Sequence, residues 1–153
     1  MSESRDGKGN IFLKILIVIL GIALIYVIVY PWQQKQSYLK LVKQSQTRME
    51  YLRSGLIYYL IETGNYPNSL NEMVDFMKNN PQILAKKDSI FKVLPGTRLN
   101  LDSLLISPVT QKQFVYINSD TSAFKKYLLY CPGGSGRIGS LSVNDSANKA
   151  TWE

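Results

Sequence analysis

The most regular pattern in the chain is a block of apolar positions near its start, between two polar segments. Residues 11–30 read IFLKILIVILGIALIYVIVY, twenty residues in which Lys14 is the one charged side chain. A helix needs about 20 apolar residues to cross the roughly 30 Å hydrocarbon core of a bilayer. Core helices seldom sustain such a run, and the small-x-small motif of a cleaved secretory signal does not precede Pro31. We therefore predict a transmembrane helix over residues 10–32, preceded over residues 1–9 by a leader or flexible tail.

Beyond Pro31 the apolar positions recur every three or four residues. This spacing predicts an amphipathic continuation of the same helix over residues 33–62, because a proline inside a long membrane helix commonly produces only a kink. We expect the resulting stripe to pack on the chain's own domain. A coiled-coil seam is the alternative, since three heptads are the minimum for one. The stripe consists of Tyr38, Val42, Ser45, Met49, Leu52, Leu56 and Tyr59.

Turn and cap signals divide the remaining residues, 63–153, into short elements. Gly64 is placed to end the long helix, and Ser69-x-x-Glu72 is a capping-box signature for a second helix from Leu70 to about Asn79. Strand-like runs follow at residues 113–117, 127–131 and 138–143, separated by turn residues at 118–120 and 132–136. Together these signals predict an α+β fold, in which a long N-terminal transmembrane and amphipathic helix packs on a small antiparallel sheet domain.

Composition narrows the classes of function. Eighteen basic and 11 acidic residues give a net charge of +7, spread along the chain without a dense basic block. Such a surface suits anionic lipid or an acidic partner, and no nucleic-acid-binding motif accompanies it, so we expect no nucleic acid partner. The absence of histidine excludes histidine-based triads and metal sites. A membrane-tethered enzyme using carboxylates, lysine or the single Cys131 remains as an alternative, but we expect a non-enzymatic protein.

The order of these features resembles the type IV pilin superfamily, and within it most closely the major pseudopilin of type II secretion. Pilin leaders end in glycine, as at Gly9, and counting from Asn10 places Pro31 at the twenty-second residue, where the family has its helix-bending proline. Residues 62–67, ETGNYP, look like the family's NGRYP turn. Residues 107–116, SPVTQKQFVY, look like its DPWGxPYxY segment, and the terminal TWE looks like its closing tryptophan.

The resemblance implies a single-pass protein of the bacterial inner membrane with a periplasmic C-terminal domain. It implies processing between Gly9 and Asn10 and assembly through helix packing with other membrane helices or like subunits, as a homo- or hetero-oligomer. Gly21 would allow close approach of a neighbouring helix. The residues that would carry this assembly are Lys14, Gly21, Pro31, Tyr38, Val42, Met49, Leu52, Leu56 and Tyr59.

Three positions depart from the family pattern. Lys14 stands where assembling pilins carry a glutamate that neutralises a neighbour's amino terminus, and Asn10 replaces the usual aromatic residue. The glycine-rich segment 133–137 contains none of the acidic residues of the pseudopilin calcium loop, although Asn144 and Asp145 follow. We expect no cofactor and an absent or altered calcium site. Lys14 favours an alternative function, an uncleaved single-pass accessory subunit of a larger inner-membrane complex in which a partner carboxylate pairs with it.

Basic residues flank the apolar block on both sides. Arg5, Lys8 and Lys14 lie at its start, and Lys35, Lys40, Lys43 and Arg48 follow its end. The positive-inside comparison is therefore nearly balanced, and charge alone does not assign an orientation.

Overall fold

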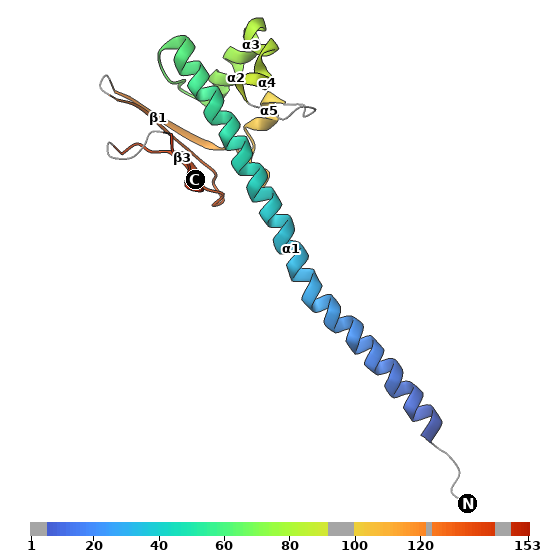
Figure 1. Ribbon diagram of the computed structural model, residues 1–153. Coiled ribbons are helices and arrows are strands. Elements are labelled where there is room, and N and C mark those ends of the chain that lie inside the picture. Colours follow the sequence, from blue (N-terminus) through green and yellow to red (C-terminus); the bar gives the residue numbers. More distant parts are fainter. Residues whose placement is uncertain (1–5, 92–99, 122–123, 143–147) are drawn as a thin grey trace, which may run out of the picture. The chain divides into compact units, whose positions relative to one another are not determined.

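The longest element is a single helix that carries both the apolar block and the amphipathic stripe. The computed structural model describes residues 6–91, 100–121, 124–142 and 148–153. Helix α1 runs from Asp6 to Thr63, 58 residues that continue through Pro31 (Figure 1). It begins inside the segment that the sequence assigned to the tail. The chain divides into two compact units, Met1–Leu39 and Lys40–Glu153, so that α1 belongs to both.

The predicted caps at the end of α1 and the start of α2 are present. Gly64 has φ +81° and its N–H donates to the carbonyl of Leu60 at 2.8 Å, so glycine ends the helix in the left-handed conformation. Helix α2 spans Leu70–Asn79, as predicted, and the Ser69 hydroxyl accepts from the N–H of Glu72 at 3.1 Å. The Glu72 carboxylate reaches back to the N–H of Asn68 at 2.7 Å. The residues that predicted the two caps thus form the hydrogen bonds that end α1 and begin α2.

Three short helices occupy part of the region between α2 and the sheet. They are α3 (Pro81–Ala85), α4 (Lys87–Ile90) and α5 (Leu101–Leu104). Asn80 and Asn100 act as N-caps of α3 and α5 through their side-chain oxygens. The sequence indicated no element here, because helices this short show hardly more than one turn of periodicity.

A three-stranded antiparallel sheet follows in the order β1-β2-β3, which confirms the α+β layout. Its strands are β1 (Val115–Thr121), β2 (Phe124–Tyr130) and β3 (Arg137–Gly139). The predicted turn at residues 118–120 is wrong, because β1 runs through it. Asn118 pairs with Tyr127 across the strands, and its amide donates to the carbonyl of Pro67 at 2.9 Å. Pairing across the sheet overrides the local turn preference of Asn-Ser-Asp.

The core of the second unit lies where α1, α2 and the sheet meet. Met49, Leu52 and Leu56 of α1 are fully buried, as are Met73 of α2 and Tyr127 and Leu129 of β2. Figure 1 shows the teal and green part of α1 beside the sheet and the short helices. Burying a leucine-sized side chain contributes about 1.5–3 kcal/mol relative to exposure. The stripe on α1 is therefore the main apolar surface on which the domain is built.

Gly55 lies at the closest approach between α1 and its neighbours. A Cβ atom there would come within 2.9 Å of Met73 Sδ and of Phe91 Cε1. Glycine in a helix interior costs about 1 kcal/mol relative to alanine, so it is retained here for space rather than for helix formation. Gly21, in the same helix, has no heavy atom within 4 Å of the equivalent Cβ position.

We predict that Gly55→Leu destabilises the domain by about 1–3 kcal/mol or more, because it overpacks the contact with Met73 and Phe91. Thermal unfolding of the full chain in detergent, followed by near-ultraviolet circular dichroism, measures this. Gly21→Leu is the matched control and should leave the transition unchanged. Equal transitions for the two variants would contradict the packing described for Gly55.

Candidate functional site

The first candidate surface is the apolar part of α1. Every large apolar side chain from Ile11 to Tyr30 is between 40% and 70% exposed. By length and composition this helix can cross a membrane, and none of its apolar window is buried inside the chain. Soluble proteins rarely expose contiguous apolar patches beyond a few hundred Å², and this surface is of a kind that lipid or other apolar helices can cover.

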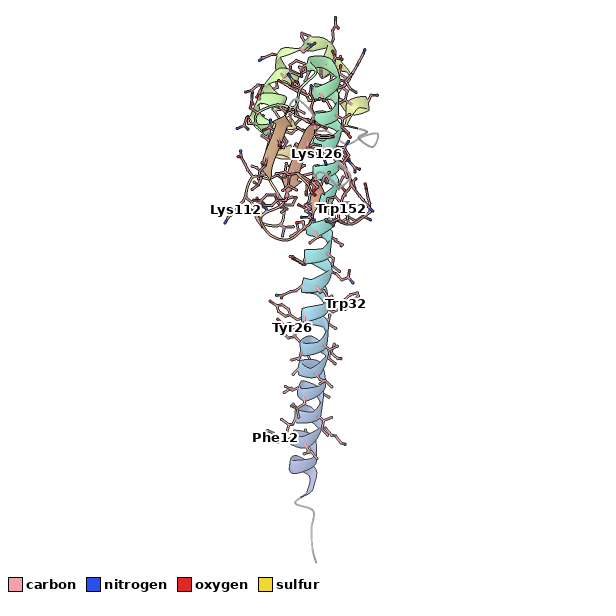
Figure 2. The ribbon with its side chains drawn as sticks, turned by 90° about the vertical axis from the view of Figure 1, so that its left-hand side faces the viewer. Phe12, Tyr26, Trp32, Lys112, Lys126 and Trp152 are labelled. Carbon is pink, nitrogen blue, oxygen red and sulfur yellow. The ribbon has the colours of Figure 1, made fainter. Side chains whose placement is uncertain are left out.

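Aromatic residues lie at the C-terminal end of this apolar surface. Tyr26 and Tyr30 stack with their ring centroids 5.5 Å apart, and the side chain of Trp32 is 63% exposed. Figure 2 shows Phe12, Tyr26 and Trp32 at successive heights on the helix. Tyrosine and tryptophan favour the level of the lipid headgroups, where one end of the ring is apolar and the other wet. This position is where the helix would leave the hydrocarbon.

The predicted assembly residues Lys14, Gly21 and Pro31 of the proposed membrane anchor, residues 10–32, are all exposed. The Lys14 ammonium group has no hydrogen bond or ion pair with another described residue. Gly21 is surrounded by open space, and Pro31 is simply accommodated within α1. The backbone of Gly9 and Asn10, the predicted processing site, is helical within α1. Lys14, Gly21 and Pro31 are thus available to an external partner.

The structure places most of the amphipathic stripe inside the domain. Met49, Leu52 and Leu56 are fully buried, and Tyr59 packs edge-on against Phe76 at 4.9 Å. The expectation that the stripe packs on the chain's own domain is confirmed for these positions, which leaves no open coiled-coil seam there. Val42 is half-buried, and Tyr38 is 49% exposed. The structure therefore separates an inner part of the stripe, which holds the domain on the helix, from an outer part that remains open.

A polar cluster at the start of the buried stripe was not predicted. Cys131 Sγ lies 3.1 Å from Ser107 Oγ, 3.2 Å from Ser135 Oγ and 3.8 Å from Ser45 Oγ. All four residues are buried. Burial by itself raises the pKa of the Cys131 thiol, but hydrogen bonding to the three hydroxyl groups outweighs this and lowers the pKa below its ordinary value.

This cluster joins three segments that are distant in the sequence. Ser45 belongs to α1, Ser107 lies between α5 and the sheet, and Ser135 lies in the glycine-rich loop after β2. Buried hydrogen bonds have strict geometry, so the cluster fixes the position of α1 against both loops. Ser45 stood in the predicted stripe, but nothing in the spacing of Ser107 and Ser135 distinguishes them from surface serines.

A second set of polar contacts fastens the C-terminus and the α5 region to α1. Trp152 Nε1 donates to Glu50 Oε1 at 3.2 Å, and Arg53 pairs with Glu153 at 2.9 Å. Trp152 thus folds back onto α1, and its ring covers Gly136. On α1, Arg48 Nη1 donates to the carbonyls of Ser103 and Ile106 at 2.8 and 2.5 Å.

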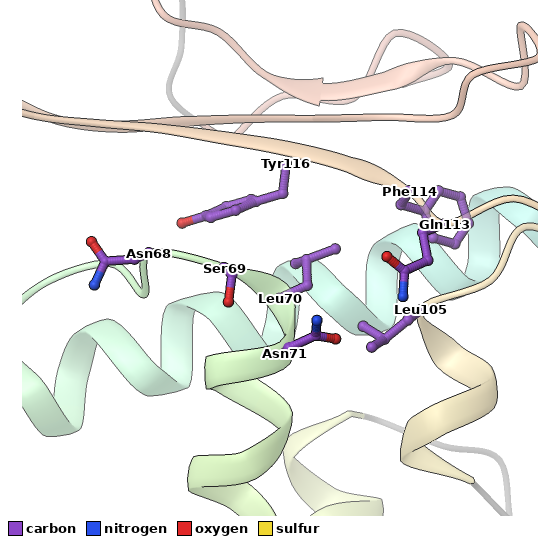
Figure 3. Close-up of a pocket in the computed structure, with 8 residues that line it drawn as sticks. All are labelled: Asn68, Ser69, Leu70, Asn71, Leu105, Gln113, Phe114 and Tyr116. Carbon is purple, nitrogen blue, oxygen red and sulfur yellow. The ribbon is translucent and has the colours of Figure 1, made fainter.

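The pocket beside the start of α2 gives little support to small-molecule chemistry. It lies between α2 and β1 (Figure 3), has a volume of about 160 Å³, and is lined by no charged side chain. Ligand sites usually enclose about 300–1,000 Å³. In the described part of the chain no three side chains of His, Cys, Asp or Glu gather as metal ligands would. Asn144 and Asp145, considered above for calcium, lie outside the described residues.

Comparison with known proteins adds no family assignment. No family model, no curated protein and no solved structure matches the chain. The features that bear on function are therefore the exposed apolar part of α1, the buried stripe and the polar cluster of this chain.

We predict that the single Cys131 thiol reports on packing between α1 and its domain. A bulky maleimide should react with it slowly in the native chain and fully after denaturation, because the side chain is only 4% exposed. Leu52→Ala should accelerate native labelling at least about thirtyfold, since loss of a buried leucine costs about 2–5 kcal/mol and labelling requires opening.

Ile61→Ala is the matched control for this measurement. Ile61 is in the same helix but 72% exposed, so its truncation should leave the labelling rate unchanged. Rapid labelling of the unmodified native chain would contradict the burial of the cluster.

Proposed function

We propose that this chain is a non-enzymatic, membrane-anchored subunit of the pilin or pseudopilin type, which assembles through helix packing in a secretion or pilus-type apparatus. The observation that carries the proposal is the difference in exposure between the two halves of α1. Its first half exposes apolar side chains on every side, and its second half buries a stripe in a small α+β domain. A subunit built in this way presents the first half for lateral packing in lipid while the domain remains in water.

The anchor offers two features to neighbouring helices. Open space around Gly21 allows another backbone to approach closely, as small residues do at membrane helix interfaces. Lys14 introduces a positive charge that costs several kcal/mol in hydrocarbon unless it is compensated or reaches the interface. Close packing and charge compensation are thus the two interactions through which assembly would be specified.

We further propose that the anchor crosses the bacterial inner membrane and that the Lys40–Glu153 unit lies in the periplasm. The support is the resemblance of the sequence to pilins, since charge on the two sides of the span is balanced. The alternative function is an uncleaved accessory subunit of a fixed inner-membrane complex. The specific observation in its favour is Lys14, which has no partner in the described part of its own chain.

Intact mass of the protein purified from membranes distinguishes the two functions. For a pilin-type subunit we expect loss of residues 1–9, with or without methylation of the new amino terminus at Asn10. Gly9→Leu is the control, because a branched side chain at the cleaved bond should leave the full-length mass. A wild-type chain that keeps its full-length mass, uncleaved as Gly9→Leu is expected to be, would overturn the filament-subunit proposal.

The charge at position 14 gives a second test, read out by cross-linking in membranes. In a filament subunit Lys14 repels the amino terminus of the neighbour, so Lys14→Glu should increase cross-linked oligomers several-fold, with Lys14→Gln intermediate and Lys14→Arg unchanged. If Lys14→Glu instead loses a co-purifying protein that Lys14→Arg retains, the lysine pairs with a partner carboxylate and the accessory-subunit function is supported.

A further inference from the structure

The segment that follows the anchor carries charge of one sign. Residues 31–49 contain Lys35, Lys40, Lys43 and Arg48 and no aspartate or glutamate, and the first carboxylate after the anchor is Glu50. Residues 121–144 also lack a carboxylate, but they carry only three basic residues, Lys125, Lys126 and Arg137, over a longer stretch. The stretch of α1 nearest the apolar anchor is therefore the most one-sided in charge.

Two of these lysines lie on a groove that runs along α1 within the second unit. The groove has a volume of about 540 Å³, and its lining residues are spaced by three and four positions, on one face of the helix. Ser45, Met49 and Leu52, which face the domain, are not among them. The lining consists of Lys40, Lys43, Gln44, Thr47, Arg48 and Tyr51.

The lysine side chains are available to bind an external anion, whereas the Arg48 side chain already donates hydrogen bonds within the domain. Lys35, Lys40 and Lys43 are exposed, and their ammonium groups form no ion pair or hydrogen bond with another described residue. Arg48 donates to the carbonyls of Ser103 and Ile106 and so holds the domain to the helix. We refer to Lys35, Lys40 and Lys43 as the juxtamembrane lysines.

We propose that the juxtamembrane lysines bind the phosphate headgroups of anionic phospholipids in the leaflet where the Tyr26–Trp32 end of the anchor emerges. The inference rests on the proposed function in one respect, namely that the apolar half of α1 spans a bilayer. It adds the chemistry of the lipid that surrounds the anchor at one end. The complementary charge is supplied by phosphate, which lysine binds as a compact cation.

Helix geometry places these lysines at the height of the headgroups. If Trp32 marks the edge of the hydrocarbon, a rise of 1.5 Å per residue puts Lys35 about 4 Å, Lys40 about 12 Å and Lys43 about 16 Å further along the helix. The headgroup layer adds roughly 5–7 Å beyond the hydrocarbon. Lys35 therefore lies within it. Lys40 and Lys43 lie within about one Debye length of its surface, and their flexible stems allow the ammonium groups to reach back.

The test measures lipid preference around the full-length protein reconstituted in phosphatidylcholine vesicles. Electron paramagnetic resonance of spin-labelled phosphatidylglycerol and spin-labelled phosphatidylcholine gives the ratio of their association with the anchor. We expect phosphatidylglycerol to be preferred at least about threefold at low salt, with the preference falling toward one in 1 M NaCl. The variant Lys35→Gln, Lys40→Gln, Lys43→Gln should lose most of this preference.

A second triple variant controls for net charge. Lys86→Gln, Lys112→Gln, Lys149→Gln removes three positive charges from exposed or partly exposed positions elsewhere in the domain, and it should keep the preference of the parent. Equal preference in the parent and the juxtamembrane variant would overturn the inference and leave those lysines for an acidic protein partner. Equal loss in both triple variants would overturn it as well, since net charge alone would then explain the preference.

Failure of the anchor itself has a different signature. If α1 does not span the bilayer, neither spin-labelled lipid shows a motionally restricted component, and the proposed function fails. If both lipids show that component to the same extent in the parent, the proposal that α1 spans the bilayer is retained, and only the inference about anionic lipid fails.

Discussion

The structure depends on one constraint: a single uninterrupted helix carries two different apolar patterns. Over residues 11–30 its side chains are apolar on all sides apart from Lys14, a pattern that suits lipid. Beyond Pro31 the buried apolar side chains of α1 lie on one face, which the domain covers. Met49, Leu52 and Leu56 on that face are fully buried, so the described part of the domain is built on the one-sided half of the helix.

Polar contacts make this docking specific. Apolar packing of Met49, Leu52 and Leu56 would tolerate some sliding of the helix, because the hydrophobic effect is non-directional. The buried hydroxyl groups around Cys131 at one end of the stripe do not tolerate it, and neither do the Glu50 and Arg53 contacts to the C-terminus. The two sets lie on different segments of the domain. Together they fix both the height and the rotation of the domain on α1.

Sequence reasoning succeeded where one physical signal dominates. The long helix, the caps at Gly64 and Ser69 and the α+β layout follow from periodicity and turn chemistry, which are local. It failed where tertiary partners decide, as for Asn118, whose turn preference yields to pairing with Tyr127. The space required at Gly55 and the convergence of Ser107 and Ser135 on Cys131 were also missed, because residues distant in the sequence create them.

Pro31 has a consequence for the depth at which the apolar part of α1 would lie in a bilayer. Proline has no N–H, so the carbonyl of Val27, one turn earlier, lacks its usual helical donor. In hydrocarbon that oxygen would cost several kcal/mol, whereas interfacial water can solvate it. In a bilayer Lys14 would be drawn toward the opposite interface, and the seventeen helical steps from Lys14 to Pro31 span about 25 Å. This distance is close to the bilayer thickness, so a shift along the membrane normal in either direction would carry one polar group into the acyl chains. If this part of α1 spans a bilayer, the two polar groups therefore set its depth without any contribution from a neighbouring helix.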